Sequence, residues 1–170
     1  MIKIYHYVNL VDWQSMYKIM IGDDGHRSYF YVDTLSLQFL SKLYGFKLRK
    51  LAGVDAFSDI KHKSNVSYLV TSDVSEGSII LPWFNSSTDM ANFIANDLPR
   101  LSLASRIVIG ISSPKQNELA LKLAKSNCLQ NVEEIHCFGA AVYNQETRIV
   151  RSKTKFFHFL VKDPKRTFLK

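Results

Sequence analysis

Hydrophobic and polar residues along the chain follow two rhythms, and each rhythm predicts one kind of element. Short runs rich in β-branched and aromatic residues predict strands, because such side chains suit a pleated and partly buried surface. Apolar residues spaced three and four positions apart predict helices. Strands are predicted at 2–10, 29–32, 67–71, 78–81, 106–111 and 134–138. Helices are predicted at 12–21, 35–44, 87–98 and 115–126.

The order of these elements predicts an α/β fold. Strands that alternate with helices favour a largely parallel sheet, and the unbroken apolar run at 106–111 is typical of a strand buried on both faces. Gly45 follows the helix at 35–44, where a glycine ends many helices. Residues 22–25, Gly-Asp-Asp-Gly, have turn chemistry. We therefore predict a single Rossmann-like domain over residues 1–147.

The composition agrees with one folded domain. Of the 170 residues, 46% are hydrophobic and 22% are charged, which excludes a disordered chain. No apolar run approaches the length of about 20 residues that a membrane-spanning helix needs. The first residues lack the pattern of a signal peptide. Cys128 and Cys137 form no CxxC pair, so we expect a reducing, cytoplasmic compartment.

The positive charge is concentrated at the end of the chain. Residues 148–170 hold eight of the 22 basic residues and one of the 15 acidic residues, so this segment accounts for the whole net charge of +7. Apolar residues with helical spacing lie among these charges, at 156, 157, 160 and 161. We predict a basic amphipathic appendage on an anionic membrane surface. A C-terminal helix packed on the domain's own core is the alternative.

Three loops that follow predicted strands are candidates for chemistry, because ligands of α/β sheets bind at the carboxyl ends of strands. The first contains Asp33 and the third begins at Gly139. The second contains Ser112 and Ser113, small residues before a helix N-terminus that could face a phosphate. A structural role is the alternative in each loop: Asp33 could cap the helix that follows it.

Other chemistries have less support. The five histidines are scattered without metal-ligand spacing, so we predict no metal and no cofactor. The nucleophile-elbow, phosphate-loop and dinucleotide-binding motifs are absent. His136 and Cys137 are neighbours on a predicted strand and point to opposite faces, which argues against a catalytic dyad. The basic segment would suit nucleic acid, but no nucleic-acid-binding motif accompanies it, so we predict no nucleic-acid partner.

Four segments, in order, resemble the motifs of the WecG/TagA/CpsF glycosyltransferases. The first resembles the family's Asp-Gly … Arg-Val-x-Gly-x-Asp block, the second its Val-Gly-x-Gly-x-Pro-Lys-Gln-Glu signature, the third its Gly-(Gly/Ala)-Ala-Phe-Asp … Arg-Ala-Pro segment, and the fourth its closing Glu-Trp-Leu … Glu-Pro-x-Arg. They are residues 32–45 with 51–55; 109–116; 139–141 with Arg148 and Arg151; and 157–160 with 163–166.

The resemblance implies roles for individual residues. Asp33 stands where the family places its catalytic base. Asn9 matches a residue that lines the family's pocket and Gln116 one that hydrogen-bonds the donor, so both would position sugars. The family is regarded as independent of metal, so cations would hold the leaving diphosphate; Lys50, Arg148 and Arg151 are the candidates. The further substrate-binding residues within the matched segments are Asp55, Ser112, Ser113 and Gly139.

The implied reaction transfers a hexose or N-acetylhexosamine from a UDP-sugar to a polyprenyl-diphosphate-linked acceptor, in polysaccharide, capsule or cell-envelope synthesis. The implied location is the inner face of the cytoplasmic membrane, as a peripheral protein. The chain departs from the family pattern at Tyr7, Thr34, Lys50, Asn117 and Tyr143. A non-catalytic protein that binds a nucleotide sugar or a partner transferase is therefore the alternative, and a basic RNA- or DNA-binding domain is a third.

Overall fold

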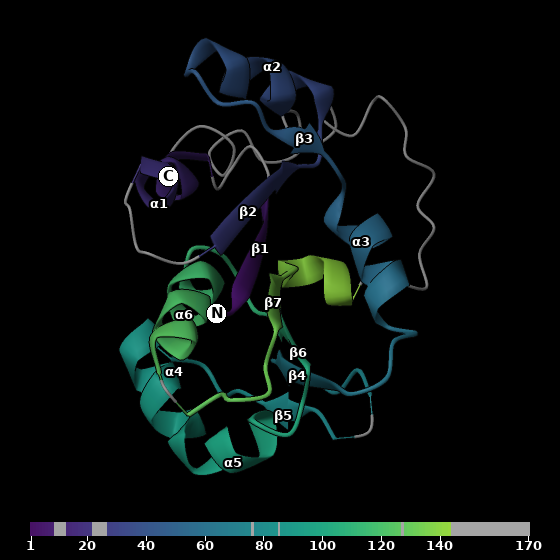
Figure 1. Cartoon of the computed structure of the whole chain (residues 1–170), viewed down its shortest axis with the longest axis vertical. Coiled ribbons are helices and arrows are strands. Elements are labelled where there is room, and N and C mark those ends of the chain that lie inside the picture. Colours follow the sequence, from purple (N-terminus) through teal and green to yellow (C-terminus); the bar gives the residue numbers. More distant parts are fainter. Residues whose placement is uncertain (9–12, 22–26, 76, 85, 127, 144–170) are drawn as a thin grey trace.

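Seven parallel strands form one sheet in the order β3-β2-β1-β7-β6-β4-β5 (Figure 1). The computed structural model describes residues 1–8, 13–21, 27–75, 77–84, 86–126 and 128–143. It confirms the predicted α/β domain and its parallel sheet, whereas the predicted boundary at 147/148 lies outside the described residues. The strands are β1 (Lys3–Val8), β2 (Arg27–Val32), β3 (Arg49–Lys50), β4 (Val66–Val70), β5 (Ile79–Ile80), β6 (Arg106–Gly110) and β7 (Glu134–Cys137).

The helices follow the predicted ones closely, with one addition. Each predicted helix is present, and the one at 87–98 is divided into α4, a 3-10 turn and α5. Ser86 caps α4, because its hydroxyl accepts a hydrogen bond from the Asp89 N–H. The helices are α1 (Trp13–Ile21), α2 (Leu35–Leu43), α3 (Gly53–Ile60), α4 (Ser87–Phe93), α5 (Leu98–Leu101) and α6 (Lys115–Lys125), with 3-10 turns η1 (Ile94–Asp97) and η2 (Gly139–Val142).

Helix α3 and strand β3 were not predicted. Helix α3 begins without a side-chain cap at Ala52 and has glycine as its first residue, so the usual signals of a helix start are missing. Gly53 packs closely here, since a Cβ on it would be in ordinary van der Waals contact, 3.4 Å from Ala141 Cβ and 3.5 Å from Tyr7 Cβ. The start of α3 therefore lies directly against β1 and η2.

The two faces of the sheet are covered unequally. On one face, α4, α5 and α6 enclose the largest cluster of buried aliphatic residues, which includes Ile4, Ile107 and Ile135 from the strands (Figure 1). On the other face, α3 packs Phe57 and Ile60 against the side of the sheet formed by β4, β6 and β7. We refer to these as the α6 face and the α3 face.

Alternation along β1 separates the two faces sharply. His6 points to the α6 face, where it contacts Asn117 of α6, and Tyr5 and Tyr7 point to the α3 face. Tyr29 and Tyr31 of β2 stand beside them in register. These tyrosines are half-buried or exposed, so the α3 face of β1 and β2 is open in the described part of the chain.

Candidate functional site

The predicted site residues that the structure describes lie mainly along one edge of the sheet. Asp33 follows β2, and its N–H donates to the Val8 carbonyl at 3.3 Å. Lys50 ends the neighbouring strand β3, where it pairs with Val32. Ser112 follows β6 and Gly139 follows β7. Because all seven strands are parallel, these positions share the carboxyl edge, as predicted.

The edge extends from Asp33 to Ser112 over several strands. Strands β2 and β6 are three places apart in the sheet, which corresponds to about 14 Å. Asp55 lies near the same edge, exposed in the first turn of α3. Asn9, Arg148 and Arg151 lie outside the described residues, so their predicted roles stay predictions.

Thr34, one of the departures from the family pattern, caps α2. Its hydroxyl accepts a hydrogen bond from the Leu37 N–H at 3.2 Å. The alternative that Asp33 is the helix cap is therefore wrong, since the residue after it makes that bond. Asp33 is instead the first residue after β2, half-buried at the carboxyl edge.

Gln116 joins the start of α6 to the end of β7. It is buried, and its Oε1 accepts a hydrogen bond from the Gly139 N–H at 2.8 Å. Gly139 has a φ of +57°, a conformation that favours glycine. The structure thus brings these two predicted residues together, with Gln116 holding the loop after β7. Its predicted contact with a donor stays a prediction.

Asn117, the second departure, connects β1 to the loop before α6. Its Oδ1 lies 2.8 Å from His6 Nδ1, and its Nδ2 donates to the Ser113 hydroxyl at 2.9 Å. Burial lowers the pKa of His6 to about 4, against the opposing effect of the bond to Asn117, so the ring is neutral at neutral pH. A neutral His6 that donates from Nδ1 therefore orients Asn117, and Asn117 orients Ser113.

Tyr143, the third departure, fills the crevice between β4 and β6. The connection from β4 runs outward to β5, and the connection from β6 runs back to β7, so the direction of winding reverses between β4 and β6. Such a reversal usually creates the ligand crevice of an α/β sheet. Here the Tyr143 hydroxyl donates to the Gly110 carbonyl at 2.8 Å and accepts from the Thr71 N–H at 2.6 Å. The ends of β4 and β6 are thus bridged by the chain itself.

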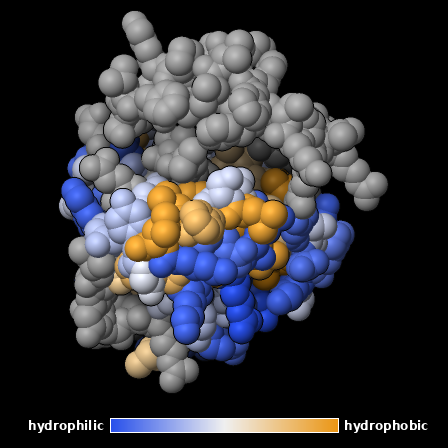
Figure 2. Space-filling view, turned by 90° about the horizontal axis from the view of Figure 1, so that it is seen from above, coloured by the Kyte–Doolittle hydropathy of each residue, from blue (hydrophilic) through white to orange (hydrophobic). Residues whose placement is uncertain are grey.

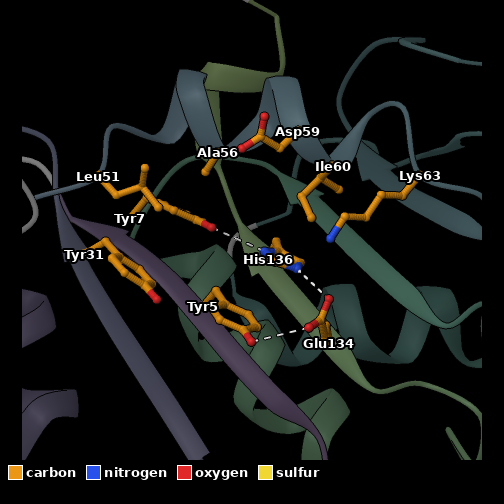
Figure 3. A pocket seen from close by; sticks show the side chains of 10 residues that line it. All are labelled: Tyr5, Tyr7, Tyr31, Leu51, Ala56, Asp59, Ile60, Lys63, Glu134 and His136. Carbon is orange, nitrogen blue, oxygen red and sulfur yellow. Dashed lines mark hydrogen bonds and ion pairs between the residues drawn. The ribbon is translucent and has the colours of Figure 1, made fainter. Parts of the chain in front are cut away.

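A pocket of about 220 Å³ lies between α3 and the α3 face of the sheet (Figure 3). Tyrosine rings form its floor in a nearly parallel arrangement: Tyr5 stacks on His136 at 4.5 Å, and Tyr7 and Tyr31 lie 5.7 Å apart. Residues from the sheet and from α3 face each other across it. The lining consists of Tyr5, Tyr7, Tyr31, Leu51, Ala56, Asp59, Ile60, Lys63, Glu134 and His136.

One end of the pocket is polar. Glu134 accepts hydrogen bonds from the Tyr5 hydroxyl at 3.4 Å and from Arg106 Nε at 2.9 Å, and its carboxylate lies 3.5 Å from His136 Nε2 (Figure 3). Burial opposes its charge, but His136 and the Arg106 guanidinium hold the pKa of the carboxyl below its usual value. The pocket therefore keeps an anionic Glu134 at this end.

His136 and Tyr5 of the pocket are uncharged at neutral pH. Burial lowers the pKa of His136 to about 4, although Glu134 acts in the opposite direction. Burial and the Glu134 carboxylate raise the pKa of Tyr5 to about 12. His136 Nδ1 lies 3.4 Å from the Tyr7 hydroxyl, so the pocket offers neutral donors and acceptors between its flat rings.

The lining of the pocket includes residues close in sequence to the carboxyl edge. Tyr31 lines the pocket two residues before Asp33, and Leu51 lines it next to Lys50. Asp33 follows Val32, the last residue of β2, and its N–H donates to the Val8 carbonyl. Because Asp33 is so close in sequence to a lining residue, we treat it and the tyrosine-lined pocket as one candidate site.

Sequence reasoning missed this pocket. Its signal was present as tyrosines two positions apart, at 5 and 7 and again at 29 and 31. Alternation alone places each pair on one face of a strand. Recognising a pocket also required the order β2-β1-β7, which adds His136, and the unpredicted helix α3, which forms the opposite wall.

Two features of the described residues bear on the classes of protein considered above. None of the helices in the described ranges is both long and apolar enough to cross a membrane. Across the same ranges, no group of three or more His, Cys, Asp and Glu side chains is arranged to hold a metal ion. Comparison of the chain with family models, with curated proteins and with solved structures finds no match.

Proposed function

We propose that the protein is a glycosyltransferase that moves a hexose or N-acetylhexosamine from a UDP-sugar to a polyprenyl-diphosphate-linked acceptor. The observation that carries the proposal is the position of Asp33 at the carboxyl edge, which also holds Lys50 and Gly139, two residues after Tyr31 of the tyrosine-lined pocket. The motif resemblance suggests the family, and the shared carboxyl edge agrees with it. The proposed location is the cytoplasmic face of the membrane, in polysaccharide or cell-envelope synthesis.

Asp33 would act as the general base. Its carboxylate accepts the proton of the acceptor hydroxyl while the hydroxyl oxygen attacks the anomeric carbon, and the bond from that carbon to the UDP oxygen breaks. The leaving diphosphate gains negative charge. Lys50, which is exposed at the end of β3, supplies a cation on the same edge. Ser112, exposed after β6 on the same edge, would present its hydroxyl to a phosphate.

The pocket would hold the planar part of the donor. Flat aromatic groups stack favourably on tyrosine rings. Tyr5 and Tyr7 each stack on a neighbouring ring on both sides, so Tyr31, at the end of the row, is the ring on which a base would stack. Hydrogen-bonding groups at its far end, Glu134 and His136, could recognise the edge of a base (Figure 3). This arrangement favours a nucleotide donor whose base lies in the pocket and whose diphosphate extends along the carboxyl edge.

A measurement of sugar transfer with Asp33→Asn tests the proposal. The substitution keeps the size of the side chain and removes the basic oxygen, so we expect turnover to fall by about 10²-fold or more while the thermal midpoint stays within a few degrees. Glu133→Gln is the matched control, because Glu133 is an exposed acid at the opposite edge of the sheet. Near-normal turnover of Asp33→Asn would sink the assignment.

A second candidate is a protein that binds a nucleotide sugar without turning it over. The observation in its favour is that Thr34, Asn117 and Tyr143, which replace family residues, are each engaged within the chain. Such a protein would retain the fold of the carboxyl edge but lack residues that the family uses for transfer. Titration with UDP-sugars separates the two: saturable binding without transfer to any lipid-linked acceptor supports the second candidate.

A further inference from the structure

Helix α2 exposes an apolar stripe that the fold does not use. Leu37 is fully buried against the sheet, whereas Leu35, Phe39 and Leu43 lie on the other side of the helix with 67%, 65% and 69% of their surface exposed. These three residues are four positions apart, so they form one continuous line along the helix. Tyr44 extends the line and is 55% exposed.

The stripe lies at one end of the molecule. Helix α2 is at the top of Figure 1, beyond β3, and Figure 2 views the molecule from that side. A hydrophobic band crosses this view with hydrophilic atoms along its border (Figure 2). Helix α2 begins two residues after Asp33, so the stripe lies close to the carboxyl edge and its candidate site.

The charged residues that follow Asp33 on α2, on the loop after it and on β3 are all basic. Lys42, Lys47, Arg49 and Lys50 are exposed on α2, on the loop after it and on β3. No acidic residue occurs between Asp33 and Asp55, so this part of the chain carries four positive charges and no negative charge. An apolar stripe with a cationic border matches the interface of an anionic membrane, where side chains enter the acyl region and cations meet phosphate groups.

The same charges argue against two other occupants. A second copy of the chain on this surface would bring two cationic borders together, which is unfavourable. Residues 148–170 carry a net charge of +7, so they too would be repelled by it. An anionic lipid surface is the partner that complements both the apolar stripe and the basic residues beside it.

We propose that α2 is a membrane-docking helix, which inserts Leu35, Phe39 and Leu43 into an anionic lipid interface. Lipid binding by α2 follows from the exposed apolar stripe and the basic residues beside it, and it does not depend on the proposed function. Its consequence for catalysis rests on the proposed function: docking through α2 holds Asp33 next to the lipid surface, where a polyprenyl-linked acceptor would arrive. This contact differs from the one predicted for residues 148–170, and stable membrane binding commonly takes two such signals.

Co-sedimentation of the full chain with vesicles tests the proposal, without donor or acceptor. We expect the chain to bind vesicles of phosphatidylcholine mixed with phosphatidylglycerol and to bind pure phosphatidylcholine weakly. The triple variant Leu35→Ser/Phe39→Ser/Leu43→Ser should reduce binding to the mixed vesicles by about tenfold or more. Leu103→Ser is the control, because Leu103 is equally exposed, at 69%, in the turn after α5. Equal binding of the triple variant and the wild type would overturn the proposal.

Three further readouts keep the test decisive. Circular dichroism and the thermal midpoint show whether the triple variant is folded; a large fall in the midpoint would show that the stripe packs within the chain and would overturn the proposal. Sedimentation velocity would reveal a dimer of the wild type that the triple variant dissociates, and such a dimer would also overturn the proposal.

Phe39→Trp reports insertion directly: brominated anionic lipids should quench its fluorescence more than that of the wild type, and equal quenching contradicts insertion. Vesicle binding is measured without donor or acceptor. A protein that binds vesicles through α2 but transfers no sugar would therefore contradict the proposed function and not the membrane-docking proposal.

Discussion

The two faces of the sheet are built from the same strands but differ in chemistry. On the α6 face, β1, β6 and β7 contribute mainly aliphatic side chains, which helices bury completely. On the α3 face, β1 and β2 contribute tyrosines and β7 contributes Glu134 and His136, around a pocket that remains open. Since successive residues of a strand point to opposite faces, one short strand can serve both purposes. The α6 face therefore holds the larger part of the core, and the α3 face holds the pocket in which we propose that the ligand binds.

The largest effect on stability should come from the α6 face. Leu119 is fully buried between α6 and the sheet, so Leu119→Ala leaves a cavity and should reduce the free energy of unfolding by about 3 kcal/mol. Urea denaturation measures this change. Tyr31→Leu, on the half-buried α3 face, should cost less than about 1 kcal/mol by the same measurement. Equal losses for the two variants would contradict the division of roles.

Acid should destabilise the protein through a histidine on each face. Burial lowers the pKa of His6 and of His136 from 6.5 to about 4, so as pH falls below 6.5 the unfolded chain takes up protons that the folded chain does not. Stability is therefore full above this range and declines from pH 6.5 toward pH 4. Between about pH 7.5 and about pH 5, each histidine should cost about 2 kcal/mol.

Single variants separate the two histidines. His136→Gln should remove about half of this pH dependence in urea denaturation between about pH 7.5 and about pH 5. His62→Gln is the control, because His62 is exposed on the turn after α3. An unchanged slope in His136→Gln would show that His136 is not the buried, neutral group described here.

Binding should be affected mainly by the α3 face. Tyr31→Leu removes a ring from the floor of the pocket and should weaken the affinity for UDP by about five- to tenfold, corresponding to about 1 kcal/mol of stacking. Calorimetric titration measures the affinity. Tyr29→Leu is a matched control on the same strand and face, since Tyr29 stacks on Tyr5 but does not line the pocket. A larger loss with Tyr29→Leu than with Tyr31→Leu would place the ligand elsewhere.

The smallest effect concerns Thr34, where the family pattern has glycine. Thr34→Ala removes the cap of α2 and should cost about 1 kcal/mol of unfolding free energy, whereas Thr34→Gly should cost only a few tenths of a kcal/mol. Urea denaturation resolves the difference. If Thr34→Gly were much more damaging than Thr34→Ala, the capping bond would not explain the threonine.

The sequence predicted the elements well where spacing and end signals agreed. The helix at 115–126 and the buried strand at 106–111 show this, and their order was enough to predict the carboxyl edge that holds Asp33 and Gly139. Helix α3 was missed because its start has glycine and no side-chain cap. The pocket was missed with it, since its two walls come from elements far apart in the chain.

Helix α2 shows a different limit of sequence reasoning. Its apolar spacing predicted a helix correctly, but apolar residues occupy two sides of it, and spacing alone does not tell which side is buried. The structure buries Leu37 and exposes Leu35, Phe39 and Leu43. That choice depends on how the chain leaves β2 after Asp33, which is a property of the folded sheet.

The most direct test of the account is a map of the backbone amides that respond to UDP in solution. The account predicts shifts of nuclear magnetic resonance signals along the carboxyl edge and the pocket, at residues 31–33, 50–56, 112–116 and 136–139, with little change in α5 on the opposite face and edge. Shifts confined to other surfaces, or no shift at saturating UDP, would contradict the claim that this edge and its tyrosine-lined pocket form a nucleotide-sugar site.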